Sequence, residues 1–257
     1  MNQKKYPAVV IHIPHSSTVI PPEYRDQLVL SDDDLAAELV RMTDAYTDEL
    51  FALASDTATT IQFPVSRLVL DPERFEDDQQ ESMASRGMGV IYQRSSLSGP
   101  LRREISGEER EALLARFYRP HHQALTEAVQ RALDTQGNCL IIDAHSFGSK
   151  PWPYEPDQTS NRPEICLGTD PFHSPPELVY FAVGAFKAQG FSVDLDKPFA
   201  GALVPMRYYQ INRNVWSIMV EVRRDLYMDE QAGLKNTFFH RILERIQKAL
   251  LQIMTVN

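Results

Sequence analysis

Short runs of apolar, β-branched residues recur along the chain, and each ends in polar or turn-forming residues. Such near-continuous runs are typical of central strands in a sheet that is covered on both faces. Pro64 interrupts the second run, which favours an edge position or a strand end for it. The segments that we expect to form strands are 8–13, 59–65, 138–143, 164–168, 191–195 and 216–222.

Amphipathic patterns with helical spacing lie between these runs. Four helices are expected, over residues 31–53, 107–133, 175–189 and 234–254. The first begins with the capping residue Ser31, and Pro120 is expected to kink or break the second. Because strands and helices alternate, the sequence predicts an α/β fold: a three-layer sandwich with a mixed, mostly parallel central sheet. Residues 1–257 are expected to form a single domain.

The composition is that of an ordinary globular protein, with 43% hydrophobic and 24% charged residues. The formal net charge of −9 disfavours nucleic acid and anionic membranes as partners. Cys139 and Cys166 both lie in apolar runs, where buried free thiols in a reducing compartment are expected. The sequence therefore predicts a cytoplasmic protein that binds neither nucleic acid nor a membrane. It leaves the oligomeric state open.

Polar residues gather where the expected strands end. His15, Arg67 and His145 follow or close three of the runs, and Glu221 lies within the last one. In open α/β sheets, ligands bind in the crevice outside the carboxyl ends of the strands. If the strands are parallel, these four side chains converge on one crevice.

His15 and His145 are candidate metal ligands because catalytic zinc commonly takes two histidines and a carboxylate. The carboxylate could be Asp44 or Asp143. The sequence has neither an HExxH nor a CxxC motif, so the spacing alone is weakly specific. Histidines in this position can equally be structural.

Glu221 interrupts an apolar run, and burying a lone carboxylate is costly unless it is paired or protonated. One interpretation is a salt bridge to an arginine such as Arg223. The other is a general base with a raised pKa beside an activated water.

Arg67 and Arg74 flank Asp71 directly after an expected strand. Most arginines are solvated surface groups, but a guanidinium in this crevice would bind a carboxylate with two hydrogen bonds. We therefore expect a small anionic substrate. A non-catalytic module that binds acidic ligands would use the same arginines.

Ser146 offers a competing interpretation. The segment AHSFG follows a strand and loosely resembles the G-x-S-x-G turn of serine hydrolases. A nucleophilic Ser146 would need an acidic residue and then a histidine downstream, and His173 and His240 are available.

Six motifs in order, from about residue 7 to residue 230, resemble those of the N-formylglutamate amidohydrolases. They are PHSS, the pair Thr43-Asp44, SRLVLDPER, DAHSFGS, KPFAGALVPMRYY and VEVRRDLYMDE. The resemblance implies a zinc-dependent exopeptidase-like fold. It also implies hydrolysis of N-formyl-L-glutamate to formate and L-glutamate, a step of histidine degradation.

The resemblance also implies a role for each matching residue. One Zn²⁺ would be bound by His15, Asp44 and His145, and Glu221 would be the base. Arginines would bind the substrate carboxylates or polarise the scissile carbonyl, and a glycine would let the backbone approach the ligand. These residues are Arg67, Arg74, Arg213 and Gly201.

The chain departs from the family pattern near the expected substrate. It has PHSS where many members have PHSG, and Asp71-Pro72-Glu73-Arg74 where many have D-x-N-R. The segment at residues 197–205 also lacks an expected double glycine. Another N-acyl amino acid or a peptide C-terminus is therefore the alternative substrate.

Overall fold

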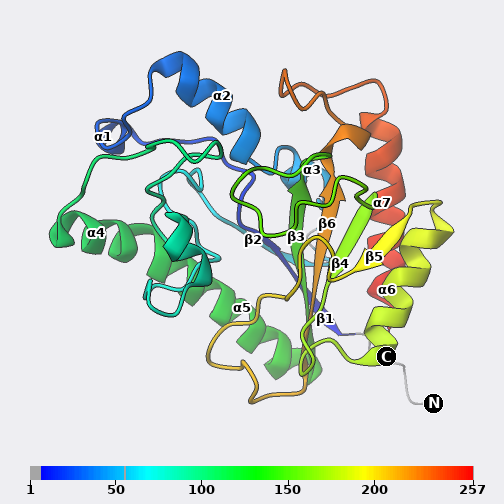
Figure 1. Ribbon diagram of the computed structural model, residues 1–257. Helices are drawn as coiled ribbons and strands as arrows, with labels where there is room; N and C mark the ends of the chain where they lie inside the picture. Colours follow the sequence, from blue (N-terminus) through cyan, green and yellow to red (C-terminus); the bar gives the residue numbers. More distant parts are fainter. Residues whose placement is uncertain (1–6, 55, 257) are drawn as a thin grey trace, which may run out of the picture.

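A computed structural model describes residues 7–54 and 56–256 and contains a six-stranded sheet (Figure 1). The order of the strands across the sheet is β2-β1-β3-β6-β4-β5. All six expected runs contribute a strand. The bounds are β1 (Ala8–Ile13), β2 (Thr59–Gln62), β3 (Cys139–Phe147), β4 (Ile165–Gly168), β5 (Val193–Leu195) and β6 (Val215–Arg223).

Four neighbouring strands, β2, β1, β3 and β6, run parallel to one another. The direction reverses at β4, which pairs antiparallel with β6 and parallel with β5. The prediction of a mixed, mostly parallel sheet is confirmed. The parallel block brings the carboxyl ends of β1, β3 and β6 to the same edge, at the upper end of the sheet in Figure 1.

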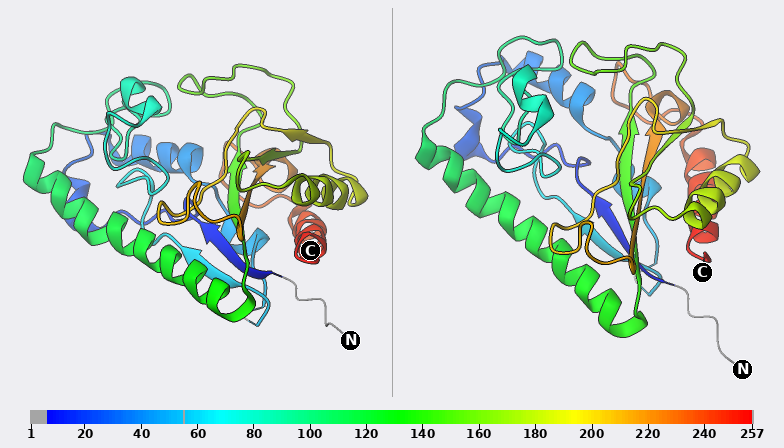
Figure 2. Two further views of the ribbon diagram at one scale, coloured as in Figure 1. Left: turned by 90° about the horizontal axis from the view of Figure 1, so that it is seen from below. Right: turned by 60° about the horizontal axis from the view of Figure 1, so that its bottom comes forward.

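Helices cover both faces of the sheet. Helix α5 (Arg119–Gln136) lies on one face, and α6 (Pro176–Ala188) and α7 (Phe239–Ile253) lie on the other (Figures 1 and 2). Successive residues of β3 point to opposite faces, so Ile141 packs in the core formed with α5 and Ile142 in the core formed with α6 and α7. Both faces of the central strands β1, β3, β4 and β6 are buried in this way, which explains why these strands are nearly continuous apolar runs. The edge strands β2 and β5 are largely exposed.

The expected helix over 31–53 is wrong in one respect, because the chain leaves the helix after Met42. Helix α2 (Asp32–Met42) begins at the capping residue Ser31, whose hydroxyl accepts a hydrogen bond from Asp34 N at 3.2 Å. The backbone is extended at Thr43 and left-handed at Tyr46, with φ of 66°, before α3 (Thr47–Leu50) begins. This interruption places Asp44 in a turn.

The expected helix over 107–133 is present as three joined pieces. Helix α4 (Gly107–Leu113) leads into a π-helical turn, η2 (Leu114–Tyr118), and then into α5. Pro120 lies in the first turn of α5, where the absence of an N–H costs little. The helix was expected to kink or break at Pro120; the irregularity is instead the π-helical turn that ends two residues before it.

Three short elements complete the fold: α1 (Pro22–Arg25), η1 (Ser82–Arg86) and η3 (Arg224–Leu226). Within residues 7–54 and 56–256, no helix combines the length and the apolar character needed to cross a membrane.

Candidate functional site

A cavity of about 600 Å³ opens at the carboxyl ends of the parallel strands. His145 on β3 and Glu221 on β6 are register partners, so they enter this cavity side by side. The predicted convergence of site residues on one crevice is thus what the structure shows. The predicted residues that line the cavity are His15, Asp44, Arg67, Arg74, His145, Gly201 and Glu221.

His15 follows β1 and is held by a carboxylate behind it. Its Nε2 lies 2.8 Å from Asp71 Oδ1. Its Nδ1 is buried and has no hydrogen-bond partner, and it lies 3.5 Å from Asp44 Oδ2. One ring nitrogen is therefore held by the protein while the other faces Asp44.

Asp44 Oδ2 also lies 3.0 Å from His145 Nδ1, so this oxygen faces a ring nitrogen of both histidines. The interruption between α2 and α3 makes this possible, because Asp44 N bonds to the carbonyl of His15 at 3.0 Å. Burial favours the neutral carboxyl. The hydrogen bonds from His145 and His15 and the charge of Arg224 outweigh it and hold the pKa of Asp44 well below its ordinary value.

Glu73 is a second carboxylate at the histidine pair, and it was not predicted as a site residue. Ligand atoms of His15, Glu73 and His145 lie within 4.8 Å of one another. Glu73 Oε2 is 3.0 Å from His145 Nε2, the ring nitrogen opposite the one that faces Asp44. The signal that could have found it is its place two residues after Asp71 and directly before the predicted Arg74.

Glu221 is a buried carboxyl with 7% exposure, and its Oε2 has no hydrogen-bond partner. Burial raises its pKa to about 8; the charge of His145 opposes this rise, whereas Asp44 adds to it. The alternative of a salt bridge to Arg223 is not what the structure shows, because Arg223 Nε binds Asp225 at 2.7 Å. Glu221 is therefore available to exchange a proton within the cavity.

The two predicted loop arginines differ in how they are held. Arg67 donates to Asp71 Oδ2 at 2.9 Å and to the Tyr92 hydroxyl at 3.0 Å, and Tyr92 in turn donates to Asp71. Arg74 has a buried Nε without a hydrogen-bond partner, 3.7 Å from Asp71 Oδ2. Arg74 thus has an N–H group that is not used in a hydrogen bond within the protein, whereas Arg67 is held by two hydrogen bonds.

Arg224 was not predicted as a site residue, yet it is buried at the centre of the cluster. It donates to Asp44 Oδ1 at 2.8 Å and to the Ser146 hydroxyl at 3.1 Å. The hydroxyl of Ser146 thus contacts an arginine instead of a base. His173 has both ring nitrogens bonded to backbone, at Val215 O and Gln210 N, so the structure gives no support to a nucleophilic Ser146.

The structure does not bring Arg213 to the cavity. Arg213 is exposed, and its guanidinium lies 4.2 Å from the centre of the Phe172 ring. Gly201, in contrast, lines the cavity with a φ of 98°, a conformation that favours glycine.

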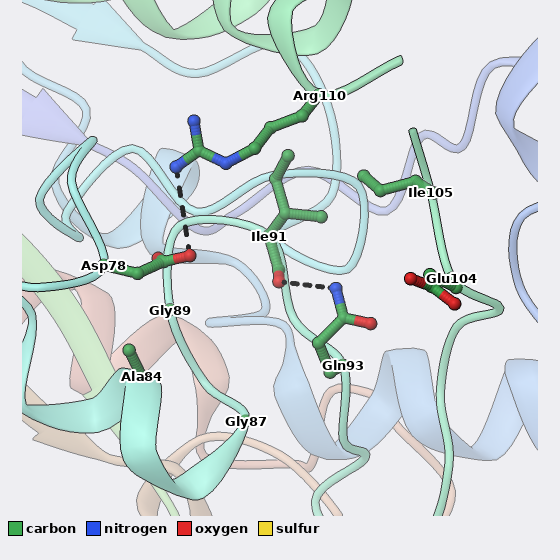
Figure 3. Close-up of a pocket in the computed structure, with 9 residues that line it drawn as sticks. All are labelled: Asp78, Ala84, Gly87, Gly89, Ile91, Gln93, Glu104, Ile105 and Arg110. Atoms are coloured by element: carbon green, nitrogen blue, oxygen red, sulfur yellow. Dashed lines mark hydrogen bonds and ion pairs between the residues drawn. The ribbon is translucent and has the colours of Figure 1, made fainter. Parts of the chain in front are cut away.

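A smaller cavity of about 230 Å³ lies elsewhere, between the loop at residues 78–93 and α4 (Figure 3). Two contacts join its lining residues: Arg110 lies 3.9 Å from Asp78, and Gln93 Nε2 donates to Ile91 O at 3.4 Å. Its lining contains none of the predicted site residues.

The fold and the large cavity define an α/β protein with a cluster of buried titratable residues in a cavity at the carboxyl ends of parallel strands. Residues 7–228 match the model of the N-formylglutamate amidohydrolase family. The chain belongs to this family of enzymes.

Two relatives are N-formylglutamate deformylases. The protein of Pseudomonas aeruginosa is 30% identical over 233 residues, which covers 87% of this chain and 83% of the relative. The protein of Pseudomonas putida is 29% identical over 254 residues, covering 96% and 90%.

Two solved structures share the fold. The N-formylglutamate amidohydrolase from Ralstonia eutropha JMP134 is similar with a TM-score of 0.82 and 24% identity, covering 98% of this chain and 94% of that one. A gene product of Agrobacterium tumefaciens is similar with a TM-score of 0.61 and 20% identity, covering 96% and 92%.

Proposed function

We propose that this protein hydrolyses the N-formyl amide of N-formyl-L-glutamate to formate and L-glutamate. The observation that carries the proposal is the buried Glu221 carboxyl, with its raised pKa, beside His15, Asp44 and His145 in one cavity. The names of the two Pseudomonas relatives support the substrate.

The residues of the cavity fit a divalent metal ion such as Zn²⁺. We assign His15 Nδ1, Asp44 Oδ2 and His145 Nδ1 to it, since the oxygen lies 3.5 Å and 3.0 Å from the two nitrogens. Tetrahedral zinc with bonds of 2.0–2.2 Å separates its ligand atoms by about 3.3–3.6 Å. The unpartnered His15 Nδ1 agrees with this assignment. A bound ion would polarise the scissile carbonyl and lower the pKa of a water molecule.

Glu221 is the base in this proposal. Its carboxylate takes a proton from the attacking water and then delivers it to the departing amine of glutamate. Burial raises the pKa of Glu221 to about 8, close to neutral pH, so the side chain can both accept and release this proton. The same side chain thereby serves both halves of the reaction.

Arg67 and Arg74 are assigned to different negative charges of the reacting substrate. Arg67 is fixed by Asp71 and Tyr92. Its Nη1, which lies 3.8 Å from Asp44 Oδ1, would donate to the oxyanion that develops on the carbonyl. Arg74 has a buried Nε–H without a hydrogen-bond partner and binds a substrate carboxylate.

Two finer expectations rest on the family resemblance: the relation to zinc-dependent exopeptidases and the place in histidine degradation. Two others, the cytoplasmic location and the single domain, rest on the amino-acid sequence. All four remain part of the proposal. A cavity of about 600 Å³ also has room for acyl groups larger than formyl, which favours another N-acyl amino acid as the second candidate substrate.

The test is a comparison of initial rates with three substrates at equal concentration: N-formyl-L-glutamate, N-formyl-L-glutamine and N-acetyl-L-glutamate. The proposal predicts the highest kcat/KM for N-formyl-L-glutamate. A preference for N-acetyl-L-glutamate would support the second candidate. No hydrolysis of any of the three by metal-loaded protein would contradict both.

A further inference from the structure

A second group of ligand atoms lies on the far side of the His145 ring from Asp44. His12, Glu73 and Asp143 offer atoms that all lie within 4.8 Å of one another. None of the three is a ligand in the proposed catalytic set. We infer that they form a second binding site for a divalent cation.

The spacing of the donor atoms carries this inference. His12 Nδ1 lies 2.8 Å from Asp143 Oδ1 and 3.5 Å from Glu73 Oε1. His145 Nε2 borders the same space, 3.3 Å from Asp143 Oδ1 and 3.0 Å from Glu73 Oε2. These separations are close to the roughly 3 Å between neighbouring ligand atoms around one octahedral cation with bonds of about 2.1 Å.

The ring of His12 is held so that Nδ1 faces the carboxylates. Its other nitrogen, Nε2, lies 2.8 Å from His121 Nε2. His121 is itself buried, and its ring packs edge-on against Phe63 with centroids 5.0 Å apart. A partner on the remote nitrogen of a histidine is what orients metal-binding imidazoles in proteins.

Two atoms at this site lack hydrogen-bond partners. They are Glu73 Oε1 and His145 Nε2, and His145 is only 4% exposed. Buried polar atoms that make no hydrogen bond are costly, and a cation would also compensate the charge of the two carboxylates. Glu73 is the most accessible of the group, with 15% of its side chain exposed, so an ion could enter from the cavity.

The charge of the cavity suggests a purpose. Seven acidic residues line it, against three arginines: Asp44, Glu73, Glu81, Asp143, Glu155, Asp170 and Glu221 against Arg67, Arg74 and Arg224. A second cation between Glu73 and Asp143 would reduce the repulsion of an anionic substrate. This purpose, unlike the site itself, rests on the proposed function. One imidazole and two carboxylates suit Mn²⁺ or Zn²⁺.

The experiment counts metal ions per chain. The wild-type protein and its variants are dialysed to equilibrium against Zn²⁺, and in parallel against Mn²⁺, and metal is measured by mass spectrometry. We expect two ions in the wild type, one in His12→Gln, one in Glu73→Gln and one in His15→Asn. His122→Gln is the matched control, since His122 bonds to Pro72 O at 2.8 Å and belongs to neither set; it should retain two ions. Circular dichroism verifies that each variant is folded.

One ion in the saturated wild type would overturn the inference, as would two ions in both His12→Gln and Glu73→Gln. Loss of an ion from His122→Gln would also overturn it, because the loss would then not be specific to these ligands. Glu73→Gln keeps the test decisive if His12→Gln does not fold, since Glu73 is partly exposed. Failure of the proposed function appears differently: two ions would bind and no N-formyl-L-glutamate would be hydrolysed.

Discussion

His15 and Asp71 are joined through the His15 nitrogen that points away from Asp44, with Nε2 lying 2.8 Å from Asp71 Oδ1. Asp71 is fully buried and is itself held by Arg67 and Tyr92. Burial favours its neutral form, but the charges of His15 and Arg67 hold the pKa of Asp71 well below its ordinary value. An ionised, fixed Asp71 therefore sets the orientation of the His15 ring before any ligand binds.

Replacement of Asp71 should loosen this arrangement. We predict that Asp71→Asn weakens the affinity for Zn²⁺ by about 10- to 100-fold, the usual effect of losing a partner behind a metal-binding histidine. Competition with a chromophoric chelator measures the affinity. Asp77→Asn, an exposed site in the same loop, is the control and should bind as the wild type does. Equal affinities for Asp71→Asn and the wild type would show that Asp71 does not position His15.

Replacement of the proposed base should separate chemistry from binding. We predict that Glu221→Gln lowers kcat by about 10²- to 10⁴-fold, because the amide cannot accept the proton of water. The metal content should be unchanged, since Glu221 is not among the assigned ligands. Glu177→Gln on the exposed side of α6 should leave kcat unaltered. If Glu221→Gln kept wild-type turnover, another group would have to be the base.

The raised pKa of Glu221 predicts a pH dependence of stability in the metal-free protein. Between its ordinary value of 4.5 and about 8, the folded protein keeps a proton that the unfolded chain releases. The free energy of unfolding should therefore fall as pH rises, by up to about 1.4 kcal/mol per pH unit relative to Glu221→Gln. Urea titrations of both proteins at several pH values between 5 and 8 test this. A difference between the two proteins that does not change with pH would refute the assigned shift.

The two cysteines should be unreactive in the folded protein. Cys139 and Cys166 are free and fully buried, and burial raises the pKa of each thiol to about 12. Because the thiolate is the reactive form, Ellman's reagent should modify them only when the chain unfolds. Rapid release of the chromophore from native protein, with urea-treated protein as the reference, would contradict their burial.

The four central strands β1, β3, β4 and β6 could be predicted because each one is buried on both faces and so reads as an apolar run. The end of β3 could not. It continues through Asp143 and His145 to Phe147, since these polar side chains contact other charged groups of the cavity and need no turn. The reversal of β4 against β6 also has no local signal, because the direction of a strand depends on the path of its connections.

For the site, the sequence indicated the residues next to strand ends but not those that meet them from elsewhere. Arg224 reaches Asp44 across 180 residues, and His12 reaches His121 across 109. Such pairs are set by tertiary packing. The turn that presents Asp44 was likewise missed, because residues 31–53 have helical periodicity throughout and Tyr46 adopts its left-handed conformation only in the fold.

The central claim is that a metal ion held by His15, Asp44 and His145 is needed to release formate from N-formyl-L-glutamate. The most direct measurement is formate release by one preparation before chelation, after removal of the metal, and after addition of Zn²⁺, with Asp44→Asn treated in parallel. The account predicts that activity is lost on chelation, returns with Zn²⁺ in the wild type, and does not return in Asp44→Asn. Undiminished formate release by verified metal-free protein would contradict it.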